Sequence, residues 1–293
     1  MKEETPFRRF VFEFVSNRIA LTGIFLLIVV VAIALFAPWI SPQNPYDLAK
    51  LDLMDARLEP GAKSVASSFT YLLGTDGQGR DMLSAIFYGL RVSLMVGVAS
   101  GLIALTLGGL LGVLAAYAGG RFEQFLMRVV DIQLGFPAIL VALILIAVLG
   151  KGVDKIIIAL VCVQWAYYAR TARSAALVER GKEYMEAARG LGLSRSRIVL
   201  KHLLPNALPP LIVVGTVQVA HAIALEATLS FLGLGLPSTE PSLGLLIANG
   251  YEYLLSGKYW ISMYPGVALL VTILAINLVG DQLRDQLNPR LAK

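Results

Sequence analysis

The sequence is short of charged residues. Asp, Glu, Lys and Arg make up only 15% of its 293 residues, whereas 57% are hydrophobic. Soluble domains carry about a quarter charged residues, and a chain of this length cannot bury so much apolar surface within itself, so lipid has to cover part of it. The shortage of charge therefore excludes an ordinary soluble domain and indicates an integral membrane protein.

Metal ligands and disulfide partners are scarce as well. The chain has two histidines, His202 and His221, and one cysteine, Cys162. Two histidines are too few for a metal site built by this chain, and a lone cysteine cannot form an intrachain disulfide. We therefore predict no metal site and no intrachain disulfide.

The sequence also lacks nucleotide-binding and catalytic motifs. A P-loop ends in Gly-Lys-Ser/Thr, but Gly181-Lys182 is followed by Glu183, and the glycine-rich stretch Gly74–Asp81 has no such ending. Neither the His-Glu-x-x-His pattern nor the Gly-x-Ser-x-Gly pattern of known enzymes occurs. We therefore predict a non-enzymatic chain with no cofactor of its own.

Long uncharged runs are abundant. A helix needs roughly 20 apolar residues to cross the hydrocarbon layer, and the uncharged runs predict an all-α, polytopic membrane protein with six spans in a single transmembrane domain, 19–293. The predicted spans are 19–40, 92–118, 130–150, 155–173, 205–227 and 260–281. The fourth uncharged run, Ile156–Ala169, holds only 14 residues. It crosses only if charged neighbours such as Lys155 and Arg170 lie at the two interfaces.

Lys and Arg are distributed unevenly between the two sides of these spans. With the N-terminal segment 1–18 in the cytoplasm, 17 of the 25 fall on cytoplasmic segments and 8 on external ones, as the positive-inside rule requires. A chain with five spans would place the cluster Arg170–Lys201 outside. We predict both termini in the cytoplasm, a long external loop, 41–91, and a cytoplasmic loop, 174–204. The net charge of +5 thus reflects orientation in the membrane, not binding to nucleic acid.

The second predicted span carries two glycine pairs at i, i+4 spacing, Gly97 with Gly101 and Gly108 with Gly112. Small residues at this spacing let another helix approach closely. The same spacing also arises by chance in glycine-rich spans. Two interpretations stay open, a helix-packing face and a spacing without a role.

The cytoplasmic loop carries the clearest local pattern. Apolar residues at i, i+3, i+4 and i+7 predict a short helix with one apolar face; they are Tyr184, Ala187, Ala188 and Leu191. Gly190 and Gly192 are expected to end this helix in left-handed conformations. Ser194 is expected to cap a second helix that runs through Lys201, and Pro205 to mark the start of the next span. The pattern predicts a helix-turn-helix at the membrane surface, with a plain solvated loop as the alternative.

The identities of these residues resemble a known signature. Glu186-Ala187-Ala188, Gly192 and Leu204-Pro205 are spaced as in the EAA-x3-G-x9-I-x-L-P signature of ABC-importer permeases, with His202 at the usual Ile position. The resemblance implies that this loop contacts an ATPase subunit. The residues that it assigns to ATPase coupling are Glu186, Ala187, Ala188, Gly190, Gly192, Leu204 and Pro205.

Four further segments narrow the resemblance. They are similar to segments of the dipeptide/oligopeptide/nickel permeases, and together they resemble the C-type member, which normally lies beside a B-type partner. In chain order they are Leu73–Asp81, Arg91–Gly97, Leu229–Pro237 and Gly280–Pro289.

This resemblance implies a fold, a complex and a location. The fold is that of type I ABC-importer permeases, in a bacterial or archaeal cell (inner) membrane. The complex contains a homologous B-type permease, two cytosolic ABC ATPases that bind ATP and Mg, and an external solute-binding protein, surrounded by membrane lipid. Dipeptides or oligopeptides are the expected solutes, with nickel or another non-peptide solute as the alternative.

An ion-coupled secondary transporter is the competing class of function. Such transporters favour ionisable side chains near the membrane midplane, and Glu226 is the one candidate that the sequence offers. An acidic group at membrane depth usually faces protein or water. We therefore expect Glu226 to line the pathway or to contact the partner permease, with a simple interface position as the alternative.

Overall fold

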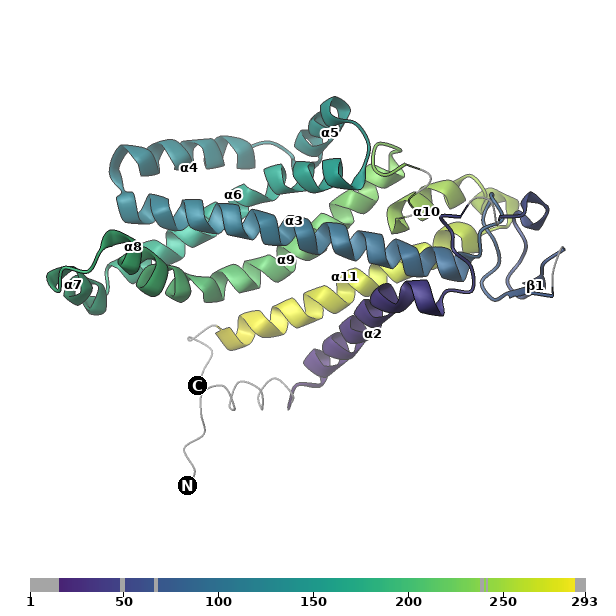
Figure 1. Ribbon diagram of the computed structural model, residues 1–293, viewed down its shortest axis with the longest axis horizontal. Coiled ribbons are helices and arrows are strands. Elements are labelled where there is room, and N and C mark those ends of the chain that lie inside the picture. Colours follow the sequence, from purple (N-terminus) through teal and green to yellow (C-terminus); the bar gives the residue numbers. More distant parts are fainter. Residues whose placement is uncertain (1–15, 48–50, 66–67, 238–239, 241, 288–293) are drawn as a thin grey trace, which may run out of the picture.

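Five long helices run along the length of the molecule (Figure 1). The computed structural model describes residues 16–47, 51–65, 68–237, 240 and 242–287, so most of the segment 1–18 and the last residues of Gly280–Pro289 lie outside the described part. The long helices are α2 (Arg18–Ile40), α3 (Met82–Ala118), α6 (Val153–Arg180), α9 (Leu204–Phe231) and α11 (Trp260–Leu287).

The two ends of this bundle carry different structures (Figure 1). At one end, which we name the α7 end, lie the short helices α7 (Glu183–Gly190) and α8 (Arg195–Arg197). At the other, the α10 end, lie α10 (Leu243–Tyr251), the one-turn helices η2 (Leu53–Asp55) and η4 (Leu254–Ser256), and a small antiparallel pair of strands, β1 (Ala62–Lys63) and β2 (Thr70–Tyr71).

Four helical runs in the described part of the chain are long and apolar enough to cross a membrane. They are α2, α3, α11 and the run Arg195–Phe231, which ends in α9. A fifth is added if α4 (Gly120–Leu134) and α5 (Ala138–Leu149) form one broken span. The prediction of an all-α, polytopic membrane protein is confirmed, whereas the number six remains a prediction.

The predicted span over 130–150 is not a single straight helix. α4 and α5 meet at a bend of 92°, and the residues between them are Gly135, Phe136 and Pro137. Proline has no N–H to continue a helix and disfavours a helical conformation at the residue before it. Helix α4 begins at Gly120, before the predicted start of the span at 130, because its charged residues are helical and do not lie in a loop.

The charges of α4 pair with α6, the helix over the predicted fourth span, 155–173. Nη2 of Arg170 lies 2.5 Å from Oδ1 of Asp131, and Nη2 of Arg173 lies 2.6 Å from Oε1 of Glu123. Both acids are on α4. The two arginines at the end of this span therefore have carboxylate partners on the neighbouring helix. Exposed pairs of this kind contribute little stability, but they fix the alignment of α4 with α6.

The helix over the second predicted span begins ten residues before the predicted start of that span. α3 starts at Met82 and not at 92, because the Asp81 carboxylate caps it by accepting the Ser84 N–H at 2.9 Å. The predicted loop 41–91 is correspondingly shorter. Arg91 marked the boundary in the sequence, yet its side chain lies on an exposed side of the helix, where one charge does not interrupt helical structure.

The glycine pairs of α3 are helix-packing faces. A Cβ at Gly97 or Gly101 would lie 2.5 Å and 2.9 Å from side-chain atoms of Ile223 and Val219 on α9. A Cβ at Gly108 or Gly112 would meet the backbone of α6, at the carbonyl oxygens of Trp165 and Ala169. The close approach that small-residue spacing allows is thus confirmed, with one pair for each neighbouring helix of the same chain.

Candidate functional site

Helix α7 ends in a glycine cap that sets the direction of the next segment. Gly192 has a φ of 71°. Its N–H donates to Arg189 O at 3.0 Å, and the Leu193 N–H donates to Ala188 O at 3.3 Å, which is the Schellman arrangement. The left-handed turn expected at Gly192 is confirmed. The same expectation for Gly190 is wrong: its φ is not positive, because a single left-handed residue closes this motif.

One face of α7 packs onto the bundle. Met185 is 0% exposed and Ala188 is 5% exposed. They join a buried apolar cluster with Ile198, Val199 and Leu203, which are the buried residues of the π-helical segment η3 (Ile198–Leu203). Burial of a methionine side chain contributes about 1.5–3 kcal/mol, so Met185 is the main apolar anchor of α7.

The apolar stripe predicted for this helix is wrong. Of its four members only Ala188 is buried; Leu191 is 78% exposed, Tyr184 is 37% exposed, and Ala187 is exposed. Met185 and Ala188, three residues apart, form the buried face instead. Over eight residues the i, i+3 and i, i+4 patterns overlap, so the pattern did not fix which face turns inward.

The predicted coupling residues gather at the α7 end. Four of them are exposed on α7 and its cap: Glu186, Ala187, Gly190 and Gly192. Ala188 lies beneath them. Leu204 is half-buried and Pro205 is exposed in the first turn of α9, directly after the η3 segment against which α7 packs. The arrangement presents a short helix whose outer face is free of contacts with the bundle.

Hydrogen bonds join α7 to the helices on either side. The Glu179 carboxylate of α6 accepts from Lys182 Nζ at 2.6 Å and from the Tyr184 hydroxyl at 2.8 Å. Asn206 Nδ2 of α9 donates to the Tyr184 oxygen at 3.3 Å and to His202 O at 2.6 Å. Three helices are therefore held together around Tyr184.

This junction shifts two pKa values. The pKa of Glu179 lies below its usual range. Partial burial acts to raise this pKa, but the hydrogen bonds from Lys182 and Tyr184 lower it by more. Burial, followed by the bond to Glu179, raises the pKa of Tyr184 to about 12. At neutral pH the carboxylate is ionised and the phenol is protonated, which is the combination that this network of donors and acceptors requires.

The second helix of the predicted helix-turn-helix is continuous with the following span. α8, the π-helical segment η3 and α9 form one helical run from Arg195 to Phe231. Ser194 stands at the N-cap position, but its side chain caps no backbone N–H. The π-helical segment includes His202, which is half-buried. The segment against which α7 packs is therefore continuous with α9.

Glu226 is buried within its own chain, and its predicted contact with the pathway or with a partner permease stays a prediction. The residue is 0% exposed. Its carboxylate accepts from the hydroxyls of Ser93 on α3 at 3.1 Å and Ser230 on α9 at 2.7 Å, and Ser242 at the start of α10 is a third partner. Glu226 thus joins three helices at the α10 end, and sequence alone did not reveal these serine partners.

The described residues contain no group of three or more His, Cys, Asp or Glu side chains that could hold a metal ion. Long apolar helices with a short, glycine-capped helix at one end define a polytopic membrane protein. The structural neighbour agrees: a chain of the MetNI methionine ABC transporter aligns with a TM-score of 0.57, covering 70% of this chain and 97% of that one, at 23% identity. This likeness shows the type I ABC-importer permease fold.

Sequence relationships give the family. Residues 108–293 match the model of the binding-protein-dependent transport system inner membrane component, and residues 5–60 match the N-terminal TM domain of oligopeptide transport permease C. The chain belongs to this family of ABC-importer permeases. It is a multi-pass inner-membrane protein and a non-catalytic transport subunit, and its family functions with an ATPase and a substrate-binding partner.

Named relatives cover nearly the whole chain. The dipeptide transport permease DppC of Escherichia coli is 39% identical over 98% of this chain and 94% of its own length. The di/tripeptide permease DppC of Pseudomonas aeruginosa is 37% identical over 98% and 93%. A putative peptide permease of Brucella suis is 42% identical over 92% and 87%.

Proposed function

We propose that this chain is one of two permeases in an importer of dipeptides or oligopeptides. An external binding protein delivers the peptide, a homologous B-type permease completes the pathway, and two cytosolic ATPases bind ATP and Mg. In this proposal the α7 end faces the cytosol, with both termini, and the α10 end faces outward. Peptide is favoured over nickel because three relatives at 37–42% identity carry peptide names.

The observation that carries the proposal is the seating of α7. Its inner face is anchored by Met185, and its first turn is tied to α6 and α9 through Tyr184. Its outer face, with Glu186 and Ala187, is exposed. A helix that transmits the movement of an ATPase has to be rigid on one side and accessible on the other, and both conditions hold for α7.

Force applied to the outer face of α7 has a direct route into the membrane. The η3 segment packs under α7 and continues into α9, and α9 packs against α3, α6 and α11. A shift of α7 therefore displaces α9 relative to its neighbours. The ion-coupled alternative depends on Glu226 as its one candidate residue, and this residue is buried among serine hydroxyls.

Charge reversal on α7 tests this proposal. In reconstituted vesicles containing the whole complex, dipeptide uptake should require ATP and should be insensitive to collapse of the ion gradients. Glu186→Lys should reduce uptake and co-purification of the ATPases about ten-fold or more, since charge-assisted contacts are worth about 1.5–3 kcal/mol.

The matched control is Glu183→Lys, which makes the same charge change in the same exposed first turn but outside the signature. It should retain most uptake. Uptake driven by an ion gradient without ATP, or full uptake by Glu186→Lys, would contradict the proposal.

A further inference from the structure

His221 is a polar side chain on the surface of α9 that the coupling role of α7 does not explain. The side chain is exposed, and it forms no hydrogen bond or ion pair with the described residues. Imidazole has two nitrogen atoms that form hydrogen bonds, so an exposed histidine needs water, a ligand or another chain beside it. Which of these is available depends on the depth of His221 in the membrane.

The contacts between α3 and α9 give this depth. Gly97 of α3 packs against Val219 and Ile223 of α9. His221 lies between these two residues in the sequence, so it is level with Gly97. The one charged side chain of α3 is Arg91, which is six residues, or about 9 Å along the helix, nearer the α10 end. His221 is therefore level with the uncharged part of α3.

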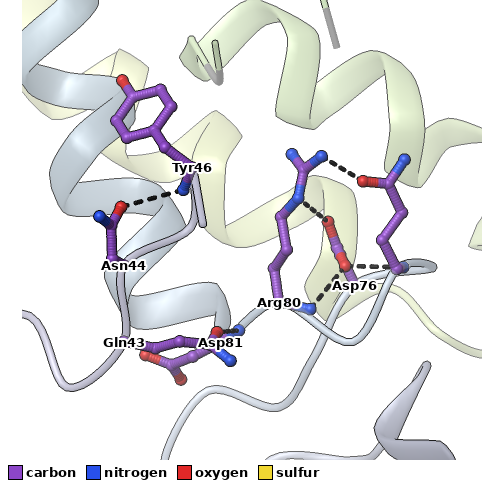
Figure 2. A network of polar contacts seen from close by, with 7 residues as sticks. Gln43, Asn44, Tyr46, Asp76, Arg80 and Asp81 are labelled. Carbon is purple, nitrogen blue, oxygen red and sulfur yellow. Dashed lines mark hydrogen bonds and ion pairs between the residues drawn. The ribbon is translucent and has the colours of Figure 1, made fainter. Parts of the chain in front are cut away.

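A polar network at the start of α3 marks the α10 end of the apolar layer (Figure 2). In it, Gln43 Oε1 accepts the Asp81 N–H at 2.7 Å. Asp81 caps α3 and lies 16 residues, or about 24 Å along the helix, from Gly97. Polar groups of this kind stay outside the hydrocarbon layer, which is about 30 Å thick. A layer that begins at this network includes His221, and so does one that begins at Arg91.

His221 points to the side of α9 away from α3. Val219 and Ile223 contact α3, and a residue two positions from them is turned by about 200° around the helix. At the same depth the exposed surface of α3 is apolar: Val98 is 43% exposed and Leu102 is 58% exposed. Such a surface suits lipid, whereas an imidazole in lipid would lack hydrogen-bond partners. The open side of α9 therefore faces water or protein.

This side of α9 belongs to the helix that the coupling segment joins. The η3 segment, against which α7 packs, is continuous with α9, so in the proposed function the surface with His221 moves during transport. The carbonyl oxygens and N–H groups of a peptide match the donor and acceptor nitrogens of imidazole. We propose that the open side of α9 lines the peptide pathway and that His221 hydrogen-bonds to the peptide there. This proposal rests on the proposed function and adds a substrate contact on this chain.

Thiol accessibility tests whether His221 faces an aqueous pathway. In a Cys162→Ala background, His221→Cys and Val98→Cys place thiols at the same depth on different surfaces of the bundle. The measured quantity is their rate of reaction with a charged methanethiosulfonate in vesicles that contain the complete complex, with and without ATP. In at least one of these two states His221→Cys should react about ten-fold faster or more, because only the thiolate reacts and a thiol in apolar surroundings stays protonated.

Protection and substitution test the contact with the peptide. A binding protein loaded with dialanine should slow the reaction of His221→Cys several-fold, whereas the empty binding protein should not. His221→Leu should lower the maximal rate of uptake about two- to ten-fold, as expected for the loss of one hydrogen bond. His221→Gln keeps a donor and an acceptor and should retain most uptake. Both variants should still co-purify with the ATPases, unlike Glu186→Lys.

The outcomes separate this inference from the proposed function. If the unsubstituted complex takes up dipeptide with ATP while His221→Cys reacts no faster than Val98→Cys in either state, lipid or the partner permease covers His221 and the pathway inference is overturned. Reaction without protection by dialanine, or full uptake by His221→Leu, would overturn the contact with the peptide. If the unsubstituted complex takes up no peptide, the proposed function itself fails.

Discussion

Substitution of Gly192 isolates the role of the glycine cap. Its φ of 71° is unfavourable for residues with a Cβ, yet no atom lies within 4 Å of the position that a Cβ would occupy. Substitution therefore introduces backbone strain without a clash. A left-handed conformation costs an L-residue roughly 1–2 kcal/mol, and a β-branched residue is a pronounced outlier there.

This cost is comparable to the stabilisation of α7. Burial of Met185 supplies about 1.5–3 kcal/mol, so Gly192→Val should offset a large part of it. A change of 1.4 kcal/mol is a factor of ten in population. We expect hydrogen exchange of the α7 amides in the complex to become about ten-fold faster, and uptake and ATPase co-purification to fall.

Gly190 provides the matched control. It lies at the end of the same helix, has no positive φ, and also has no atom within 4 Å of a Cβ. Gly190→Ala should leave exchange unchanged or slow it, because alanine favours a helix by about 1 kcal/mol. Gly192→Asn should be milder than Gly192→Val, since Asn tolerates the left-handed region. Equal exchange and equal uptake in Gly192→Val and the unsubstituted protein would refute the reasoning.

Three other substitutions test separate parts of the structure. Gly112→Ala should lower the free energy of unfolding by about 1–3 kcal/mol, because the added methyl group collides with α6. Gly109→Ala should be tolerated, because the atom nearest to its added Cβ is 3.6 Å away. Because the pKa of Glu179 is lower in the folded protein, its ionised carboxylate stabilises the α7 junction at pH values above the unfolded pKa, and this stabilisation is lost as the pH falls through the folded pKa. Lys182→Met removes one cause of the low pKa. As the pH is lowered, hydrogen exchange of the α7 amides should therefore accelerate at a higher pH in Lys182→Met than in the unsubstituted protein. Glu226→Gln should retain uptake, since the amide oxygen can accept from one serine hydroxyl while the amide NH2 donates to the oxygen of the other. Complete loss of uptake with normal folding would favour the ion-coupled hypothesis.

The sequence predicted best what depends on spacing alone. A helix-packing face was one of the two interpretations of Gly97 through Gly112, because small residues at i, i+4 remove side-chain volume from one helix face, whichever helix fills the space. The left-handed turn at Gly192 was likewise accessible, since glycine is the residue with the smallest penalty there. Both predictions needed only local geometry.

Boundaries and orientations were less accessible because they depend on tertiary neighbours. Arg91 and the charges of α4 ended uncharged runs in the sequence. An exposed position, in the case of Arg91, or an arginine partner on α6, in the case of the α4 carboxylates, allows such residues to remain in a helix. The nine residues of α10 are too few for a span, and they form a helix between α9 and α11. The inward face of α7 depended on Met185, whose partners lie on η3.

Glu226 illustrates a different limit. Its depth in a predicted span indicated a functional group, since an isolated carboxylate is costly in lipid. The serines that surround it come from α3, α9 and the start of α10, and only the folded arrangement brings them together. The same structure therefore satisfies the carboxyl group without a pathway or a partner subunit.

Site-specific crosslinking tests the contact between α7 and an ATPase most directly. A photoreactive amino acid at Leu191, which is 78% exposed beside the glycine cap, should crosslink to the ATPase subunit in the intact complex. The same amino acid at Leu255, fully exposed at the α10 end, should give no ATPase adduct. An ATPase adduct from position 255, or none from position 191 in a complex that still imports peptide, would contradict the assignment of α7 as the coupling helix.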